Sequence, residues 1–180
     1  CLRLQPPAGA ETRRTTKSLS EMTQNIEPDS SAPAVVRLQD HYGGLDGRDL
    51  LEPLITRVFA GRIALVSSFG AESAVLLHMV AGIDRATPVI FLDTGKHFAQ
   101  TISYRRKLAR ELGLRDVRDI EPAAAALAQE DPHGDLWRSD PDACCTLRKV
   151  TRLTEALAGL DAWITGRKPF HGAGRIALPV

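Results

Sequence analysis

One stretch constrains the fold of this chain more than any other, the segment RIALVSSFGAESAVLLHMVA at residues 62–81. A short apolar run at residues 63–66 is followed by small polar residues at 67–70 and then by an apolar segment, residues 71–81, that is long enough for a helix. This order predicts a strand, a tight loop and a helix. Free backbone N–H groups and the positive end of the helix dipole converge where such a loop enters its helix, so the segment is a candidate site for phosphate or sulfate.

The composition of this loop leaves two interpretations open. The hydroxyls of Ser67, Ser68 and Ser73 can add donors to the anion site. The same serines would also suit an ordinary crossover in which one of them caps the helix. The stretch lacks the GxxxxGK[ST] signature, so it is not a Walker-type phosphate loop.

The balance of charge in the chain restricts its partners. The 180 residues are 43% hydrophobic and 25% charged, which suits one globular domain with a sizeable core. Twenty-three Lys and Arg residues against 22 Asp and Glu give a net charge of +1, so nothing calls for nucleic acid or an anionic membrane as a partner, and any anion site must be local. No apolar run is long enough to span a bilayer. Three cysteines, two of them adjacent, form no disulfide framework and favour a reducing, cytoplasmic compartment.

Residues 1–32 differ in composition from the remainder. They are rich in Thr, Ser, Pro and Arg and have no sustained apolar period, so we expect a disordered leader followed by a single domain at residues 33–180. Met22 is a candidate for the biological start. A transit peptide is the alternative, against which Glu11 and Glu21 argue.

Further strands and helices alternate along the rest of the chain. Leu50, Leu54 and Val58 recur at helical spacing. The other expected elements are a strand at 88–92, a helix at 97–112, a strand at 117–120, a helix at 123–128, a helix from 140 through 157 and a strand at 162–165. Alternation at these lengths predicts an α/β fold with a doubly wound, mostly parallel sheet.

Two details of these elements bear on the site. In an open parallel sheet ligands bind beyond the carboxyl ends of the strands, so Asp93-Thr94-Gly95-Lys96 should face the same crevice as the Ser67 loop. In the helix at 97–112 we expect Phe98, Ile102, Leu108 and Leu112 to point inward, and Arg105, Arg106, Lys107 and Arg110 to form a solvated face.

The stretch WRSDPDACCTLRK at residues 137–149 determines the predicted chemistry. Asp140 followed by Pro141 is a helix-start signal, with Asp as N-cap and Pro at the first helical position. Cys144 and Cys145 then fall in the first turns, where the helix dipole favours thiolate. Arg148 and Lys149 follow the two cysteines at a spacing of four, so each cysteine has a basic residue on its own helix face.

The geometry of adjacent cysteines limits what they can bind. Neighbouring helical residues point about 100° apart, which makes one tetrahedral zinc ion an awkward target for both sulfurs and would strain a disulfide between them. A polynuclear iron–sulfur cluster, with separate irons to offer, accommodates them more readily. Two ordinary structural cysteines beside surface bases remain the alternative.

A second basic loop follows the strand at 162–165. Gly166, Arg167 and Lys168 lie at the end of that strand, and Arg175 follows shortly after. Charge and position make these basic residues candidates for holding phosphate or sulfate. The lone His171 is interpreted as a surface residue.

Four stretches together carry a resemblance to a known family. They are SSFGAES at 67–73, LDTGKHF at 92–98, DPDACCTLRKV at 140–150 and ITGRK at 164–168. In this order and at these spacings the chain resembles the assimilatory adenylyl-sulfate reductases, relatives of the phosphoadenylyl-sulfate reductases, over about residues 35–180.

The resemblance implies an adenine nucleotide α-hydrolase-like, Rossmann-like fold and reduction of adenylyl sulfate to sulfite and AMP with electrons from thioredoxin. It implies that Cys144 and Cys145 are two of four ligands of a [4Fe–4S] cluster, with Arg148 and Lys149 beside cluster and substrate as catalytic residues. The expected substrate-binding residues are Ser67, Ser68, Phe69, Gly70, Ser73, Leu92, Asp93, Thr94, Gly95, Gly166, Arg167 and Arg175.

One departure from the family pattern concerns the end of the chain. The second cysteine pair and the nucleophilic cysteine of the family would lie beyond Val180, and no cysteine follows Cys145. We therefore expect a C-terminally incomplete chain that does not turn over and does not hold a stable cluster. A missing last strand would leave a sheet edge on which a second copy could pair, so a homo-oligomer stays open.

Three other functions stay open at this point. The tandem cysteines favour adenylyl sulfate over its 3′-phosphorylated form only by resemblance, so a phosphoadenylyl-sulfate reductase is one alternative. An ATP pyrophosphatase-type enzyme is another, although its loop is SGGxDS where this chain has SSFGAES. The third is a nucleotide-binding protein without enzymatic activity.

Overall fold

The computed structural model describes Arg3, Leu4 and residues 34–166. The strands are β1 (Arg3–Leu4), β2 (Ile63–Val66), β3 (Val89–Leu92), β4 (Val117–Ile120) and β5 (Ala162–Thr165). The helices are α1 (Ala34–Tyr42), α2 (Gly47–Pro53), α3 (Ser73–Ile83), α4 (Ala99–Leu112), α5 (Ala124–Glu130), α6 (Leu136–Ser139), α7 (Pro141–Cys145) and α8 (Thr151–Ala156), with two π-helical segments, η1 (Leu54–Val58) and η2 (Thr146–Val150).

The strands form one sheet in the order β1-β5-β2-β3-β4. β5, β2, β3 and β4 run parallel, and β1 pairs antiparallel with β5. In the centre of the sheet Leu65 lies opposite both Val89 and Ile164. The predicted α/β fold with a mostly parallel sheet is therefore confirmed. Because the four parallel strands share one direction, the loops that follow them emerge at one edge, called here the carboxyl edge.

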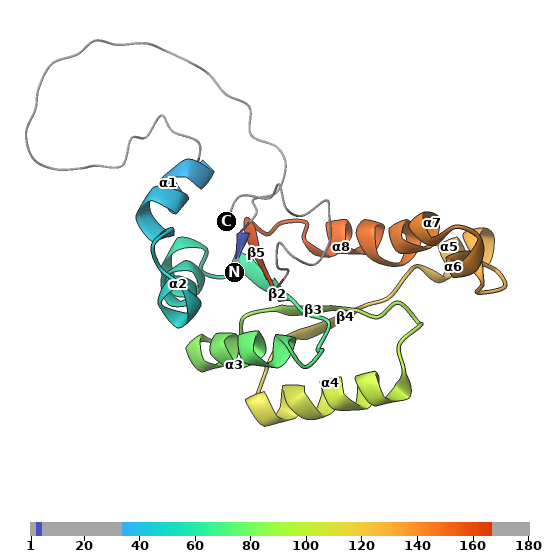
Figure 1. Cartoon of the computed structure of the whole chain (residues 1–180), viewed down its shortest axis with the longest axis horizontal. Helices are drawn as coiled ribbons and strands as arrows, with labels where there is room; N and C mark the ends of the chain where they lie inside the picture. Colours follow the sequence, from blue (N-terminus) through green and yellow to red (C-terminus); the bar gives the residue numbers. More distant parts are fainter. Residues whose placement is uncertain (1–2, 5–33, 167–180) are drawn as a thin grey trace, which may run out of the picture.

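Helices cover the sheet on both faces, with α3 and α4 side by side on one face and α7 and α8 on the opposite side (Figure 1). Burial from both sides explains why β2 and β3 are continuous apolar runs without alternation. β4 lies at the end of the strand order and is only half-buried, which fits its sequence VRDI. The core side chains come from the sheet, from the loop after β2 and from the inner faces of α2, η1, α3 and α4: Leu51, Ile55, Ile63, Leu65, Phe69, Leu76, Leu77, Val80, Val89, Phe91, Leu108, Ala162 and Ile164.

Two helical regions differ from the prediction. The single helix expected around Leu54 is α2 followed by the π-helical segment η1, and Pro53 stands at the junction. Proline cannot donate an intrahelical hydrogen bond, and its ring clashes with the carbonyl of the residue four positions earlier, which accounts for a change of helical geometry there. The helix expected from residue 140 through 157 is likewise divided into α7, η2 and α8. α1 was not predicted, because its Val35 and Val36 are exposed and give no inward-facing period.

The orientation predicted for α4 is wrong at two positions. Phe98, expected inside, is 79% exposed, and Arg105, expected on the solvated face, is buried. The Arg105 guanidinium lies 5.8 Å from the ring centroid of Phe69 and 5.3 Å from that of Phe91, and it pairs with Asp119 of β4. Aromatic faces and a carboxylate together stabilise a cation in the core, which a rule based on hydrophobicity does not anticipate.

The disordered leader at residues 1–32 stays a prediction. Within this segment, Arg3 and Leu4 form β1 against β5. The rest of the 1–32 segment, including Met22, lies outside the described residues. Within the described part of the chain, no helix has the length and hydropathy needed to cross a membrane.

Candidate functional site

The loop after β2 is shaped by two buried residues. The Ser67 Oγ accepts a hydrogen bond from the Phe69 backbone N–H at 3.1 Å. Phe69 has a φ of +54°, a region that non-glycine residues rarely adopt, and its ring packs edge-on against Phe91. These contacts hold the turn in place and leave Ser68 and Gly70 exposed at the carboxyl edge.

The start of α3 supplies fewer donors than the sequence suggested. α3 begins at Ser73, whose N–H donates to the Gly70 carbonyl at 2.9 Å, and the Ala74 N–H donates to the Ala71 carbonyl at 3.3 Å. These amides therefore already have acceptors within the turn. Ser68 and Gly70 are exposed and remain candidates for contact with an anion.

The loop after β3 is a tight turn fixed by its own side chains. Beyond the half-buried Leu92, the Asp93 Oδ1 accepts from the Gly95 N–H at 3.0 Å, and the Thr94 Oγ1 accepts from the Lys96 N–H at 3.3 Å. Thr94 is buried, and Gly95 has a φ of +69°, a conformation that suits glycine. The turn thus holds a defined backbone at the carboxyl edge beside the Ser67 loop.

The helix that carries the cysteines starts as predicted. The Asp140 Oδ1 accepts from the Ala143 N–H at 2.9 Å, and Pro141 occupies the first turn. Cys144 is buried and Cys145 is exposed, and both are free thiols. The Lys149 Nζ lies 3.9 Å from the Cys145 Sγ, so the two residues share a face of the helix.

Arg148 does not extend over Cys144 as the spacing of four had suggested. It is buried, and its Nη1 donates to the Thr94 carbonyl at 2.7 Å while its Nη2 donates to the Asp131 Oδ2 at 2.5 Å. The Arg148 guanidinium and the Leu136 N–H hold the pKa of the Asp131 carboxyl below its ordinary value. The sequence did not predict a role for Asp131, because the segment EDPHGD at residues 130–135 has the composition of an ordinary exposed turn.

Arg148 links two of the segments that carry predicted site residues. The bond from Arg148 to Thr94 joins the cysteine helix to the loop after β3, and the loops after β2 and β5 emerge at the same edge. Gly166 is exposed there, so close to α3 that a Cβ on it would lie 3.6 Å from a methyl of Leu76. Arg167, Lys168, His171 and Arg175 lie outside the described residues.

The residues present fit half of an iron–sulfur ligand set. Cys144 and Cys145 offer two unpaired thiols at a helix opening, which is the donor chemistry that such clusters require. Within residues 34–166, no three His, Cys, Asp or Glu side chains gather as a metal-binding group. Two thiols alone do not close a tetrahedral zinc site, and a cluster would need further ligands.

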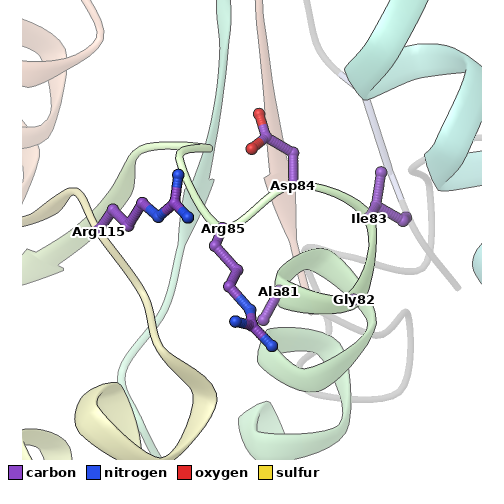
Figure 2. A pocket seen from close by; sticks show the side chains of 6 residues that line it. All are labelled: Ala81, Gly82, Ile83, Asp84, Arg85 and Arg115. Atoms are coloured by element: carbon purple, nitrogen blue, oxygen red, sulfur yellow. The ribbon is translucent and has the colours of Figure 1, made fainter.

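A hollow of about 380 Å³ lies elsewhere, at the end of α3 and the start of β4 (Figure 2). Its lining residues are Ala81, Gly82, Ile83, Asp84, Arg85 and Arg115. The end of α3 leads into β3 and Arg115 leads into β4, so this hollow is at the amino edge of the sheet. It is separate from the loops that carry the predicted site.

Comparison with known proteins points to one family. The family described as phosphoadenosine phosphosulfate reductase domain matches residues 62–180. A protein of Mesorhizobium japonicum named adenosine 5′-phosphosulfate reductase is 50% identical over 152 residues, which is 84% of this chain and 60% of that protein. A protein of the same name from Chelativorans sp. is 43% identical over 160 residues, which is 88% of this chain and 65% of that protein. The chain thus spans somewhat less than two thirds of these relatives.

A solved structure agrees with the sequence relatives. The crystal structure of phosphoadenylyl-sulfate reductase from Candida auris, in a phosphate complex, superposes with a TM-score of 0.59 and 25% sequence identity. The match covers 82% of this chain and 70% of that one. The four-strand parallel sheet with helices on both faces is therefore the adenine nucleotide α-hydrolase-like fold that the resemblance implied.

Proposed function

Because the chain belongs to the phosphoadenosine phosphosulfate reductase domain family, we propose that it is the nucleotide-binding part of an enzyme that reduces adenylyl sulfate to sulfite and AMP. The observation that carries this proposal is the meeting of a tandem-cysteine helix with the loop after β3, through the bond from Arg148 to Thr94. The two relatives quoted above bear the name of this activity. The proposed preference for adenylyl sulfate over its 3′-phosphorylated form rests on the tandem cysteines, through their resemblance to those of the family.

The proposed reaction has two steps. A cysteine thiolate from outside the described residues attacks the sulfur of adenylyl sulfate, and the bond from sulfur to the AMP phosphate oxygen breaks, so that AMP leaves and an S-sulfocysteine remains. One thiolate of a thioredoxin dithiol then attacks the cysteine sulfur of that adduct, which releases sulfite and leaves a mixed disulfide between enzyme and thioredoxin. The second thioredoxin thiol attacks the thioredoxin sulfur of this mixed disulfide, so that thioredoxin closes to its disulfide and the enzyme thiolate is regenerated. The dithiol supplies the two electrons that convert sulfate sulfur to sulfite sulfur.

The carboxyl edge of the sheet supplies the proposed substrate contacts. In this proposal the loop after β2 holds the phosphosulfate group and the loop after β3 lines the nucleotide. The proposed contact residues are Ser67, Ser68, Phe69, Gly70, Ser73, Leu92, Asp93, Thr94, Gly95, Gly166, Arg167 and Arg175. Of these, Ser68, Gly70, Gly95 and Gly166 are exposed, while Phe69 is buried and acts through the shape of the turn.

Lys149 is the described residue best suited to compensate the charge of the reaction. Bringing a thiolate to a dianionic substrate requires local positive charge. Lys149 is exposed, and its Nζ lies 3.9 Å from the Cys145 Sγ. Arg148, expected to share this role, already faces the buried carboxylate of Asp131, so its charge is largely compensated.

Cys144 and Cys145 would hold one side of a [4Fe–4S] cluster, with two further thiolates from outside the described residues. When bound, such a cluster adds a charged, polarisable group beside the substrate. We expect about four irons per full-length protein, and loss of iron and acid-labile sulfide in Cys144→Ser and Cys145→Ser. A full-length protein without iron would contradict this part of the proposal.

Free thiols also favour the cytoplasm as the location.

Isothermal titration with adenylyl sulfate tests the substrate directly. We expect saturable binding that weakens by at least about tenfold in Lys149→Ala, since one close charge contact is lost. Lys107→Ala is the matched control, because Lys107 is an exposed lysine on α4 whose partner is Glu111. Equal affinity in both variants would contradict the role of Lys149.

Two assays separate the proposal from its alternatives. Incubation with ATP and magnesium should release no pyrophosphate, and release would favour an ATP pyrophosphatase-type enzyme. The full-length protein with reduced thioredoxin should form sulfite from adenylyl sulfate. Binding of AMP without any sulfite formation would indicate a nucleotide-binding protein that is not an enzyme.

A further inference from the structure

Asp131 is a buried carboxylate that the sequence pattern does not predict. The Asp131 side chain has no exposed surface, and that of Arg148 is 7% exposed. Both Asp131 oxygens are used: Oδ2 accepts from the Arg148 Nη2 at 2.5 Å, and Oδ1 accepts from the Leu136 N–H at 3.0 Å. The carboxylate thus fixes the turn between α5 and α6 and one side of the guanidinium.

The other side of the guanidinium reaches the loop after β3. The Arg148 Nη1 donates to the Thr94 carbonyl at 2.7 Å, and a Cβ on Gly95 would lie 3.6 Å from that nitrogen. The Lys96 Nζ donates to the Gly134 carbonyl at 2.5 Å, which ties the same loop to the same turn a second time. The Arg148 guanidinium thus joins the helix that carries the cysteines to both the loop after β3 and the turn after α5.

The energetics indicate that this pair contributes geometry more than stability. Removing two charges from water costs about as much as their attraction returns, so an apolar pair of similar volume is often as stable. The Arg148 Nε is buried without a hydrogen-bond partner among the described residues, which adds a further cost. What an apolar pair cannot reproduce is a planar fork whose two donors have fixed directions, one toward Asp131 and one toward Thr94.

We propose that Asp131 is a positioning residue of this site: it orients the Arg148 guanidinium so that Arg148 holds the Thr94 carbonyl and fixes the loop at residues 92–96 against the cysteine helix. The consequence for nucleotide binding rests on the proposed function, in which this loop lines the nucleotide. The fixed geometry itself does not depend on that function.

Two variants separate positioning from stability. Asp131→Leu combined with Arg148→Met replaces the ion pair by apolar side chains of similar size, so we expect the melting temperature to stay within about 5 °C of the original. Arg148→Lys keeps the charge but offers a point ammonium that cannot serve both acceptors in the same way. Arg152→Met is the control, because Arg152 lies in α8, directly after η2, and also bonds the carbonyl of Glu121 and the carboxylate of Glu155.

Two readouts are followed in each variant. Amide hydrogen exchange at residues 92–97 should become at least about tenfold faster in the double variant and in Arg148→Lys, with the strands β2 and β3 unchanged. The dissociation constant for AMP, measured by calorimetry, should rise by at least about tenfold in the same variants. Arg152→Met should change neither quantity.

The outcomes are distinguishable from those of the proposed function. Normal exchange at residues 92–97 in either folded variant would overturn the positioning role, and so would faster exchange spread evenly over the whole molecule. If the double variant does not fold, Arg148→Lys decides by the same readout. If the original chain binds no AMP, the proposed function fails, while the exchange measurement still decides whether the pair of Asp131 and Arg148 positions the loop.

Discussion

At the scale of single residues, two buried arginines hold parts of the fold that the apolar pattern leaves undefined. Arg105 joins α4 to the sheet through Phe69, Phe91 and Asp119. Arg148 joins the cysteine helix to the loop after β3. Both side chains are long enough to place apolar methylene groups in the core while the guanidinium reaches a carboxylate.

Replacement of Arg105 should cost stability although it removes a charge from the core. We expect Arg105→Ala to lower the free energy of unfolding by about 2 kcal/mol, because the methylene packing and the cation–π contacts are lost together. Urea denaturation measures this. The neighbouring Arg106 is exposed, and Arg106→Ala should change the value by less than about 0.5 kcal/mol. Equal stability of the two variants would show that Arg105 contributes nothing to the core.

The Asp131 carboxylate should make the free energy of unfolding depend on pH. Arg148, the Leu136 N–H and Lys96 hold its pKa below the ordinary value of 3.8. The Asp131 carboxylate is therefore protonated at a lower pH in the folded state than in the unfolded state. Its contribution to the free energy of unfolding is complete above pH 3.8 and disappears as the pH falls through the pKa of the folded state. The side chain in Asp131→Asn does not titrate. The difference in unfolding free energy between the original chain and this variant should therefore become smaller as the pH is lowered from 5 toward 3, about the range in which carboxylates titrate. Urea unfolding at a series of pH values measures this, and a constant deficit would contradict it.

At the scale of elements, the sequence determines where the cysteine helix starts but not how it continues. The pair Asp140-Pro141 predicts the N-terminus because cap and first-turn residues act locally, and the structure confirms it. The π-helical segment η2 and the inward direction of Arg148 were not predictable in this way. The spacing rule for helical pairs assumes α-helical geometry and solvent-exposed charges, and both assumptions fail once a buried carboxylate from another segment is available.

The cap of this helix can be tested alone. We expect Asp140→Ala to lower the free energy of unfolding by about 1 kcal/mol, because the Ala143 N–H loses its acceptor, while Asp140→Asn should retain most of the stability. Asp142 is a matched acid in the same turn, and Asp142→Ala should cost only about 0.3 kcal/mol through the helix dipole. Thermal or urea denaturation compares the three. If Asp142→Ala cost as much as Asp140→Ala, the N-cap assignment would be wrong.

At the scale of the whole molecule, the parallel sheet and the edge that carries the loops follow from the sequence. The apolar runs of β2 and β3 and the small residues after them are local signals, and parallel strands bring their ends together by topology alone. The pairing of β1 with β5 and the approach of Asp131 to Arg148 join segments far apart in the chain, so no local pattern announces them. The sequence therefore predicts the architecture of the site better than the contacts that fix its geometry.

We propose that the carboxyl edge of this sheet binds a sulfate-bearing adenine nucleotide. The decisive test follows the backbone amide chemical shifts of the 19.6 kDa chain by NMR during titration with adenylyl sulfate. We predict saturable shifts confined to residues 67–73, 92–96 and 143–149, with no change around Arg85 and Arg115 at the amino edge. Shifts at that opposite hollow, or none anywhere at saturating nucleotide, would contradict the claim.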